Sequence, residues 1–236
     1  MLLGRDHELK ELNDLYAQHD RGIILLSGPL YVGKTELMTW FLSGKQGEYF
    51  YAKSCTDTRQ LKLFSKTLVG DEMTFQAWDE ALGTLATYPA TEKHVLVIDE
   101  FQNIQRSDNH FLDALKRTWE HKLQHCQWLI LLVTSSEAFL EMEFYGSKRQ
   151  YDKMLIKHIK LGEIGSFDMA AFFPLLDAEG WVKCYSLLGG NPWLLRRWKV
   201  HLDFEEQIRK VLLAKESGFH LWVDGYFNKE LRETQV

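Results

Sequence analysis

Runs of apolar residues recur along the chain, and each has the length of a β-strand. Three of them, at residues 22–27, 94–98 and 128–133, are almost uninterrupted. Such continuous runs are typical of strands that are buried on both faces of a parallel sheet. A short aromatic run at 48–52 and an alternating stretch at 155–161 predict two further strands. The pattern therefore predicts a sheet of five strands.

Helical periodicity fills the segments between these runs. At residues 5–19, Leu9, Leu12, Leu15 and Tyr16 share one face, with charged residues between them. The same reasoning predicts further helices at 35–42, 57–68, 74–87, 107–124 and 137–144. Because strands alternate with helices, we expect an α/β fold with a parallel sheet flanked by helices.

The first predicted buried strand leads into a phosphate-binding motif. Residues 28–35 have the sequence GPLYVGKT, which fits the P-loop pattern G-x-x-x-x-G-K-[ST], and a predicted helix follows. Gly28 and Gly33 allow the tight turn that points successive backbone N–H groups at a phosphate. Lys34 supplies a cation for the β- and γ-phosphates, and Thr35 offers a hydroxyl to Mg²⁺. A glycine-rich turn that binds nothing is the alternative, and the strand–loop–helix context disfavours it.

The whole P-loop segment is therefore a candidate nucleotide site. Besides the motif glycines, Lys34 and Thr35, the predicted nucleotide-binding residues in and next to the loop are Pro29, Val32 and Glu36.

Two acids follow the buried run that ends at Ile98. In a parallel sheet, Asp99 would lie at the carboxyl edge, where it can hold Mg²⁺ through the water shell of the ion. Glu100 is placed to orient and polarise a water for attack on the γ-phosphorus. The alternative is a pair of acids that simply ends a strand, but the upstream P-loop favours a catalytic pair of the Walker B type.

A third polar strand end follows the run at 128–133. Thr134 or Ser135 is a candidate sensor of the γ-phosphate or of the attacking water. Serine and threonine also end many strands by capping the next helix, so this alternative stays open.

Composition limits the partners that we expect. The net charge is −5 and the pI is about 6.0, so the chain carries no global basic field for bare nucleic acid. Basic residues do cluster at 148–160 and 196–199, although each cluster can also be an ordinary solvated face. DNA therefore stays open as a partner without being indicated by charge.

Cysteine usage and hydropathy add two expectations. Three widely spaced cysteines suggest neither a disulfide framework nor a zinc site. No signal-peptide pattern and no membrane-length apolar run is evident. We expect a cytoplasmic protein without a membrane association.

Four stretches together resemble the archaeal-type ATPases of the STAND/AAA+ division of P-loop NTPases. They are the start with Gly4-Arg5, the P-loop, the Asp99-Glu100 pair followed by Phe101-Gln102, and the GGNP element at 189–192. The resemblance covers about residues 1–200. It implies a P-loop NTPase with sheet order 5-1-4-3-2 and a small C-terminal helical lid.

The same resemblance implies two further nucleotide contacts. Arg5 would lie near the nucleotide, although by itself it would be expected to be a surface charge. Pro192 would approach the adenine or ribose from the lid. The expected division is a P-loop ATPase core at 1–163, a helical lid at 164–203 and a helical, aromatic-rich tail at 204–236.

The chain departs from this family in three places. The P-loop carries Leu30-Tyr31 where these ATPases commonly have arginine, so any role of that residue is absent. Gly146-Ser147-Lys148-Arg149 stands where relatives usually have Gly-Arg, which makes Arg149 a candidate arginine acting on the γ-phosphate of a neighbouring subunit. Relatives commonly continue into a winged-helix or nuclease-like domain, and the residues beyond the lid are too few for one. We therefore expect a protein partner or self-association.

The leading functional hypothesis is an Mg-ATP-binding ATPase that uses its nucleotide state as a conformational or assembly switch. One alternative is a DNA-transaction or transposition helper of the AAA+ type that uses the local basic clusters. Another is an interaction module that holds ATP or ADP with negligible turnover. A small-molecule kinase shares the P-loop but gains no support from the Asp99-Glu100 pair.

Overall fold

The computed structural model describes residues 2–89, 91–146, 150–199, 203–220, 223–225 and 227. The chain divides into two compact units, which we describe separately. The sheet unit comprises Leu9–Gly28 and Lys34–Lys160, and the helical unit comprises Met1–Glu8, Pro29–Gly33 and Leu161–Val236.

The sheet unit contains five parallel strands, as the apolar runs predicted. They are β1 (Gly22–Ser27), β2 (Gly47–Tyr51), β3 (His94–Asp99), β4 (Trp128–Thr134) and β5 (Leu155–Lys160). The strand order is β2-β3-β4-β1-β5, which is the expected order 5-1-4-3-2 counted from the opposite edge. The predicted fold class and strand order are therefore confirmed.

The register of the strands brings their carboxyl ends to one edge. Ser27 at the end of β1 pairs with Thr134 at the end of β4, and Asp99 at the end of β3 pairs with Val133. Every residue of β1, β3 and β4 is buried, in agreement with their continuous apolar sequences. The P-loop, the acidic pair and the Thr134-Ser135 pair all leave the sheet at this edge.

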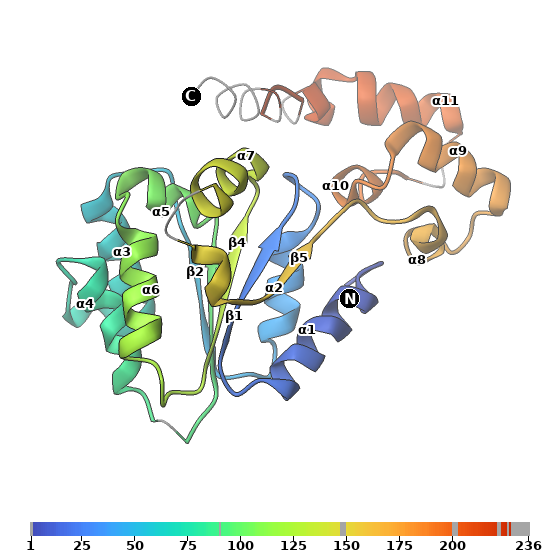
Figure 1. Cartoon of the computed structure of the whole chain (residues 1–236). Coiled ribbons are helices and arrows are strands. Elements are labelled where there is room, and N and C mark those ends of the chain that lie inside the picture. The colour runs from blue at the N-terminus through green and yellow to red at the C-terminus, as the bar shows by residue number, and fades with distance from the viewer. Residues whose placement is uncertain are drawn as a thin grey trace. The chain divides into compact units, whose positions relative to one another are not determined.

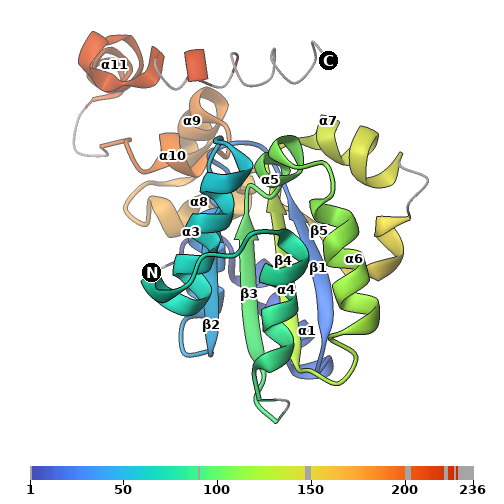
Figure 2. The same ribbon diagram turned by 90° about the vertical axis from the view of Figure 1, so that its left-hand side faces the viewer.

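Helices cover both faces of the sheet (Figure 1). One face carries α1 (Asp6–Gln18) and α2 (Lys34–Leu42), and the other carries α3 (Asp57–Val69), α4 (Trp78–Gly83) and α6 (Phe111–His121). Figure 2 shows this second helical layer from the front. Its packing is aromatic, because the Trp78 ring lies edge-on to Phe64 and Phe111 with centroids 5.2 and 4.9 Å apart.

The remaining elements of the sheet unit are short. They are α5 (Gln102–Ser107), α7 (Glu137–Phe139), the 3₁₀ turns Gly70–Glu72, Thr84–Thr87 and Tyr151–Met154, and the π-helical turn Leu140–Tyr145. Two helix predictions were wrong at their boundaries. The helix expected at 74–87 starts only at Trp78, and the one expected at 107–124 covers only Phe111–His121. Asp108 explains why the second of these helices starts later than predicted. Helix α5 ends just before Asp108, and the Asp108 Oδ1 accepts a hydrogen bond from the His110 N–H (2.9 Å), which forms a turn before α6.

The helical unit consists of short helices around a core of its own. Its elements are α8 (Met169–Phe172), α9 (Ala178–Leu188), α10 (Pro192–Leu195), α11 (Phe204–Gln207), the π-helical turn Ile208–Leu213, and the 3₁₀ turns Ser166–Asp168 and Lys215–Ser217. Ile164, Met169, Leu188, Trp198 and Val211 belong to one buried cluster. The division into core, lid and tail at residues 163 and 203 stays a prediction.

Among the described residues, none of the helices combines the length and the apolar sequence that a membrane crossing requires.

Candidate active site

The loop between β1 and α2 has the backbone conformation that its glycines favour. Gly33 has φ of +96°, in the left-handed region that side chains disfavour. Tyr31 also has a positive φ of +64°, which is costly for an aromatic residue. Lys34, the first residue of α2, is buried, and its Nζ donates to the carbonyl oxygen of Gly28 (2.7 Å). Lys34 thus reaches back along the loop to its first residue.

Asp99 lies in a polar cluster at the end of β3. Its Oδ2 accepts hydrogen bonds from Thr35 Oγ1 (2.8 Å) and from the hydroxyl of Tyr49 on β2. Burial raises the pKa of the Asp99 carboxyl, while the bonds from Tyr49 and Thr35 oppose the shift. Burial and the neighbouring Asp99 both raise the pKa of the Tyr49 phenol, so it stays a donor at neutral pH.

The second oxygen of Asp99 marks a position for a cation. Oδ1 is buried and has no hydrogen-bond partner among the described residues. An unpaired carboxylate oxygen in the interior is costly, and a divalent metal is one group that satisfies it. With the Thr35 hydroxyl bonded to the same carboxylate, the donor set is oxygen only, as Mg²⁺ prefers. The residues present therefore fit a magnesium ion.

Glu100 follows Asp99 and is held by two side chains, one from the segment after β4 and one from α5. It is buried, and its φ of +57° lies in the left-handed region, a strained conformation for a non-glycine residue. Its Oε2 accepts hydrogen bonds from Ser135 Oγ (2.6 Å) and from Gln102 Nε2. The Oε1 of Gln102 in turn accepts from Thr134 Oγ1 (2.7 Å). A continuous chain of buried hydrogen bonds thus joins Thr134, Gln102, Glu100 and Ser135.

Helix α7 is capped by Ser136 and not by Thr134 or Ser135, the predicted sensors. Ser136 Oγ accepts from the N–H of Phe139 (3.1 Å) and caps α7. The capping alternative for Ser135 is therefore wrong, because its hydroxyl is directed to Glu100 instead. Thr134 Oγ1 donates to Gln102 and accepts from the N–H of Ser136 (3.2 Å).

Two residues of this cluster were missed in the sequence. In the sequence, Gln102 appears only within the family resemblance, and Tyr49 only within a predicted aromatic strand. The position of each residue relative to Asp99 is the feature that could have identified it as part of the site. Gln102 lies within one helical turn of the acidic pair, and Tyr49 is on the strand beside β3.

Arg5 belongs to the helical unit and is not a surface charge. Its side chain is buried, and Nη2 donates to the carbonyl oxygens of Val32 (2.9 Å) and Gly162 (2.5 Å). Nη1 donates to Glu8 Oε1 (2.8 Å), whereas Nε is buried and has no hydrogen-bond partner among the described residues. Arg5 therefore binds the backbone of the P-loop interior, and the expectation of an exposed charge was wrong.

Pro192 also lies against the P-loop interior, within the helical unit. It opens α10, whose N-cap Asn191 accepts from the N–H of Trp193 (3.0 Å). The Pro192 ring lies 3.9 Å from the point where a Cβ on Gly33 would be, and the Trp193 and Tyr31 rings are 6.1 Å apart. The GGNP element and the middle of the P-loop are neighbours.

The remaining predicted residues are distributed as follows. Gly28 and Glu36 flank the loop, at the end of β1 and in the first turn of α2, and Pro29 lies in the part of the loop that belongs to the helical unit. Arg149 lies outside the described residues, so its role stays a prediction.

Two lysines of the predicted basic cluster at 148–160 have acidic partners. Lys157 and Lys160 form ion pairs with Glu11 (2.8 Å) and Glu137 (3.7 Å).

Comparisons with known proteins show which proteins this chain is similar to. A protein of Methanocaldococcus jannaschii is 22% identical over 99% of this chain and 52% of its own length, so the chain spans about half of that relative. A Walker-type ATPase of Pyrococcus abyssi has a similar structure, with a TM-score of 0.72 and 15% identity over 99% of this chain and 77% of that chain.

A further solved structure is the ORC2 protein of Aeropyrum pernix in ADPNP–ADP complexes. Its TM-score is 0.57, with 17% identity over 72% of this chain and 50% of that chain. At these identities the two structures support the fold. The profile of one family, described as an ATPase domain predominantly from Archaea, matches residues 2–197. The chain therefore belongs to this family of ATPase domains, which come predominantly from Archaea.

Proposed function

We propose that this chain binds Mg-ATP and hydrolyses it to ADP and phosphate, and that the bound nucleotide switches its conformation or assembly. The observation that carries the proposal is the acidic pair at the end of β3. Asp99 presents a buried oxygen without a hydrogen-bond partner among the described residues, next to the P-loop Thr35. Glu100, one residue further on, is held by donors from two other elements.

The P-loop supplies the phosphate contacts in this proposal. Backbone N–H groups of the loop would hold the phosphates, and Lys34 would exchange its bond to the Gly28 carbonyl for phosphate oxygens. Thr35 and Asp99 would hold Mg²⁺, which supplies positive charge against the β- and γ-phosphates when bound. Family membership and the ADPNP and ADP bound to the Aeropyrum protein support a nucleotide at this site.

Glu100 would act as the base for the attacking water. As the water oxygen bonds to the γ-phosphorus, its proton passes to the Glu100 carboxylate and the bond to the β–γ bridging oxygen breaks. The leaving oxygen departs with ADP. Ser135 and Gln102 position the carboxylate through their bonds to Oε2.

The switch part of the proposal rests on the hydrogen-bond chain between β4 and β3. In this proposal Thr134 is the residue that responds to the γ-phosphate, and Gln102 connects its hydroxyl to Glu100. A change at the tip of β4 would therefore be transmitted to the catalytic carboxylate. We expect a protein partner or a second copy of the chain to respond to it, with Arg149 as the candidate residue in trans.

An interaction module with negligible turnover is the second candidate. It is favoured by the internal contacts of the two catalytic side chains, since Lys34 is bonded to Gly28 and Glu100 to Gln102 and Ser135. In this case the nucleotide would be held without hydrolysis until a partner released Glu100.

Two variants separate these candidates. Lys34→Ala should weaken ATP binding by about tenfold to 150-fold, which corresponds to about 1.5–3 kcal/mol for one charge-assisted bond. Glu100→Gln should preserve ATP binding and suppress phosphate release by roughly 10²–10⁴-fold, the usual contribution of a general base. Wild-type protein that binds ATP but releases no phosphate would favour the interaction module. Unchanged turnover in both variants would contradict the mechanism.

A further inference from the structure

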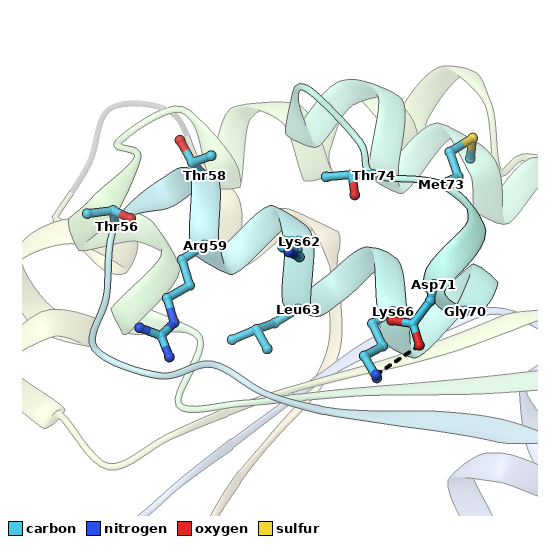
Figure 3. A pocket seen from close by; sticks show the side chains of 10 residues that line it. All are labelled: Thr56, Thr58, Arg59, Lys62, Leu63, Lys66, Gly70, Asp71, Met73 and Thr74. Atoms are coloured by element: carbon cyan, nitrogen blue, oxygen red, sulfur yellow. Dashed lines mark hydrogen bonds and ion pairs between the residues drawn. The ribbon is translucent and has the colours of Figure 1, made fainter.

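A groove lies along α3 of the sheet unit and contains none of the residues assigned to the nucleotide site. Its volume is about 700 Å³, and Figure 3 shows the side chains that line it. These are Thr56, Thr58, Arg59, Lys62, Leu63, Lys66, Gly70, Asp71, Met73 and Thr74. We call this surface the basic groove, because three cations and one acid are among its lining side chains.

The three cations follow one another along the exposed side of α3. Arg59, Lys62 and Lys66 are spaced by three and four residues, so they form a single stripe about 4.5 and 6 Å apart along the helix axis. The opposite side of the helix packs into the core through Leu61 and Phe64, which are 3% and 0% exposed. The helix thus holds the stripe in a fixed direction toward solvent.

The charges of this stripe are largely unpaired. Lys66 forms an ion pair with Asp71 (3.0 Å), whereas the side chains of Arg59 and Lys62 form no ion pair within the described part of the chain. Other basic clusters differ in this respect. Lys157 and Lys160 have acidic partners, and the guanidinium of Arg197 lies over the Trp193 ring, 3.4 Å from its centroid.

This chemistry is complementary to a row of anions. Neighbouring cations on a rigid helix repel one another, and bound anions would relieve this repulsion. Threonine hydroxyls from the N-terminal end of α3 (Thr56 and Thr58) and from the segment after the helix (Thr74) border the cations and can donate to phosphate oxygens. Arginine, lysine and threonine are among the side chains that contact the phosphates of nucleic acids.

The residue types in the lining also indicate which kind of nucleic acid the groove fits. Single strands are usually bound by stacking bases on aromatic rings, and the described lining contains no aromatic side chain. Sequence readout uses amide side chains or bidentate arginine contacts to base edges, and the described lining contains no Asn or Gln and only one arginine. We propose that the basic groove binds the phosphate backbone of duplex DNA without reading its sequence.

The test measures binding of the full chain to a short, fluorescently labelled DNA duplex by anisotropy over a range of salt concentrations. The variant is Arg59→Gln/Lys62→Gln, which removes two exposed cations outside the nucleotide site. The matched control is Lys183→Gln/Lys210→Gln, which changes the net charge equally at two exposed lysines paired with glutamates of the helical unit. A charge-preserving variant, Arg59→Lys/Lys62→Arg, distinguishes an effect of lost charge from an effect of disturbed folding.

We expect the groove variant to lower affinity about tenfold or more, and to reduce the slope of log K against log salt by about two, roughly one per phosphate contact. The lysine control and the charge-preserving variant should bind like wild type. An equal loss in the lysine control would overturn the proposal, as would undetectable duplex binding by wild type. Tighter binding of single-stranded DNA, duplex RNA or polyglutamate than of duplex DNA would also overturn it.

Discussion

The hydroxyl of Ser135, directly after β4, donates to Oε2 of Glu100, directly after β3, over 2.6 Å. Gln102 donates to the same oxygen and accepts from Thr134, so the two strand ends are linked twice. The acid that we assign to water activation is therefore positioned by the strand that carries the candidate phosphate sensor. This link provides a physical route by which nucleotide state and catalysis can be coupled.

Gln102→Leu is expected to lower kcat more than it changes the KM for ATP. The substitution removes the donor to Glu100 and the acceptor of Thr134, so the carboxylate loses its position while the P-loop is untouched. We expect a loss of roughly tenfold to a hundredfold, on the scale of one charge-assisted hydrogen bond. Steady-state kinetics with varied ATP measure the split.

Gln105→Leu is the matched control for this prediction. Gln105 lies on the same helix and is buried, and it bonds to the carbonyl of Asn109 (2.8 Å) and the N–H of Leu112 (3.0 Å). The Gln105→Leu variant should lose about 1–3 kcal/mol of folding stability, an amount comparable to the loss in Gln102→Leu, while its kcat stays close to that of the wild type. If Gln102→Leu turns over faster than wild type, Gln102 restrains Glu100 rather than positioning it.

His158 should make the folding stability of the chain depend on pH. Its Nε2 bonds to Ser27 Oγ (2.9 Å), next to the P-loop, and its Nδ1 bonds to the Tyr145 hydroxyl (2.7 Å). Burial lowers the pKa of His158 from its ordinary value of 6.5; the charge of Lys160 also lowers it, and Glu137 opposes the shift. The folded state therefore disfavours the imidazolium. Stability is fully present above pH 6.5 and falls as the pH drops below it.

Urea unfolding at a series of pH values tests this dependence. His158→Gln should flatten the decline just below pH 6.5. A decline that is identical in wild type and in His158→Gln would assign the pH dependence to other groups.

Gly190→Ala is expected to destabilise the helical unit severely. A Cβ at Gly190 would lie 2.0 Å from the carbonyl oxygen of Ile164. This oxygen belongs to the backbone, and moving it would disturb the hydrogen bond that the Ile164 N–H donates to the Gly190 carbonyl oxygen (2.8 Å). The cost of such a clash is about 3 kcal/mol or more. Thermal unfolding should show the loss. Gly162→Ala is the control, since a Cβ there has nothing within 4 Å, and it should unfold like wild type.

The sequence predicted the sheet well because burial on both faces leaves a strong local pattern. The runs at 22–27, 94–98 and 128–133 became β1, β3 and β4 with little change in bounds. Helix ends were predicted less well, because they depend on single side chains. The Asx turn at Asp108 that separates α5 from α6 is one such case.

The candidate site was predictable only where its residues belong to one motif. Lys34, Thr35, Asp99 and Glu100 follow from local patterns and the order of strands. The contacts of Tyr49 with Asp99 and of Thr134 with Gln102 join residues 50 and 32 positions apart, and periodicity carries no information about such pairs. The burial of Arg5 likewise depends on Gly162, 157 positions away.

The most direct test of the central claim is the steady-state rate of ATP hydrolysis per subunit, measured over a wide range of protein concentration with Glu100→Gln as control. We predict hydrolysis that rises per subunit with concentration, as expected for a site completed by assembly, and that is lost in Glu100→Gln while this variant still binds ATP. Hydrolysis by Glu100→Gln at the wild-type rate would contradict the account.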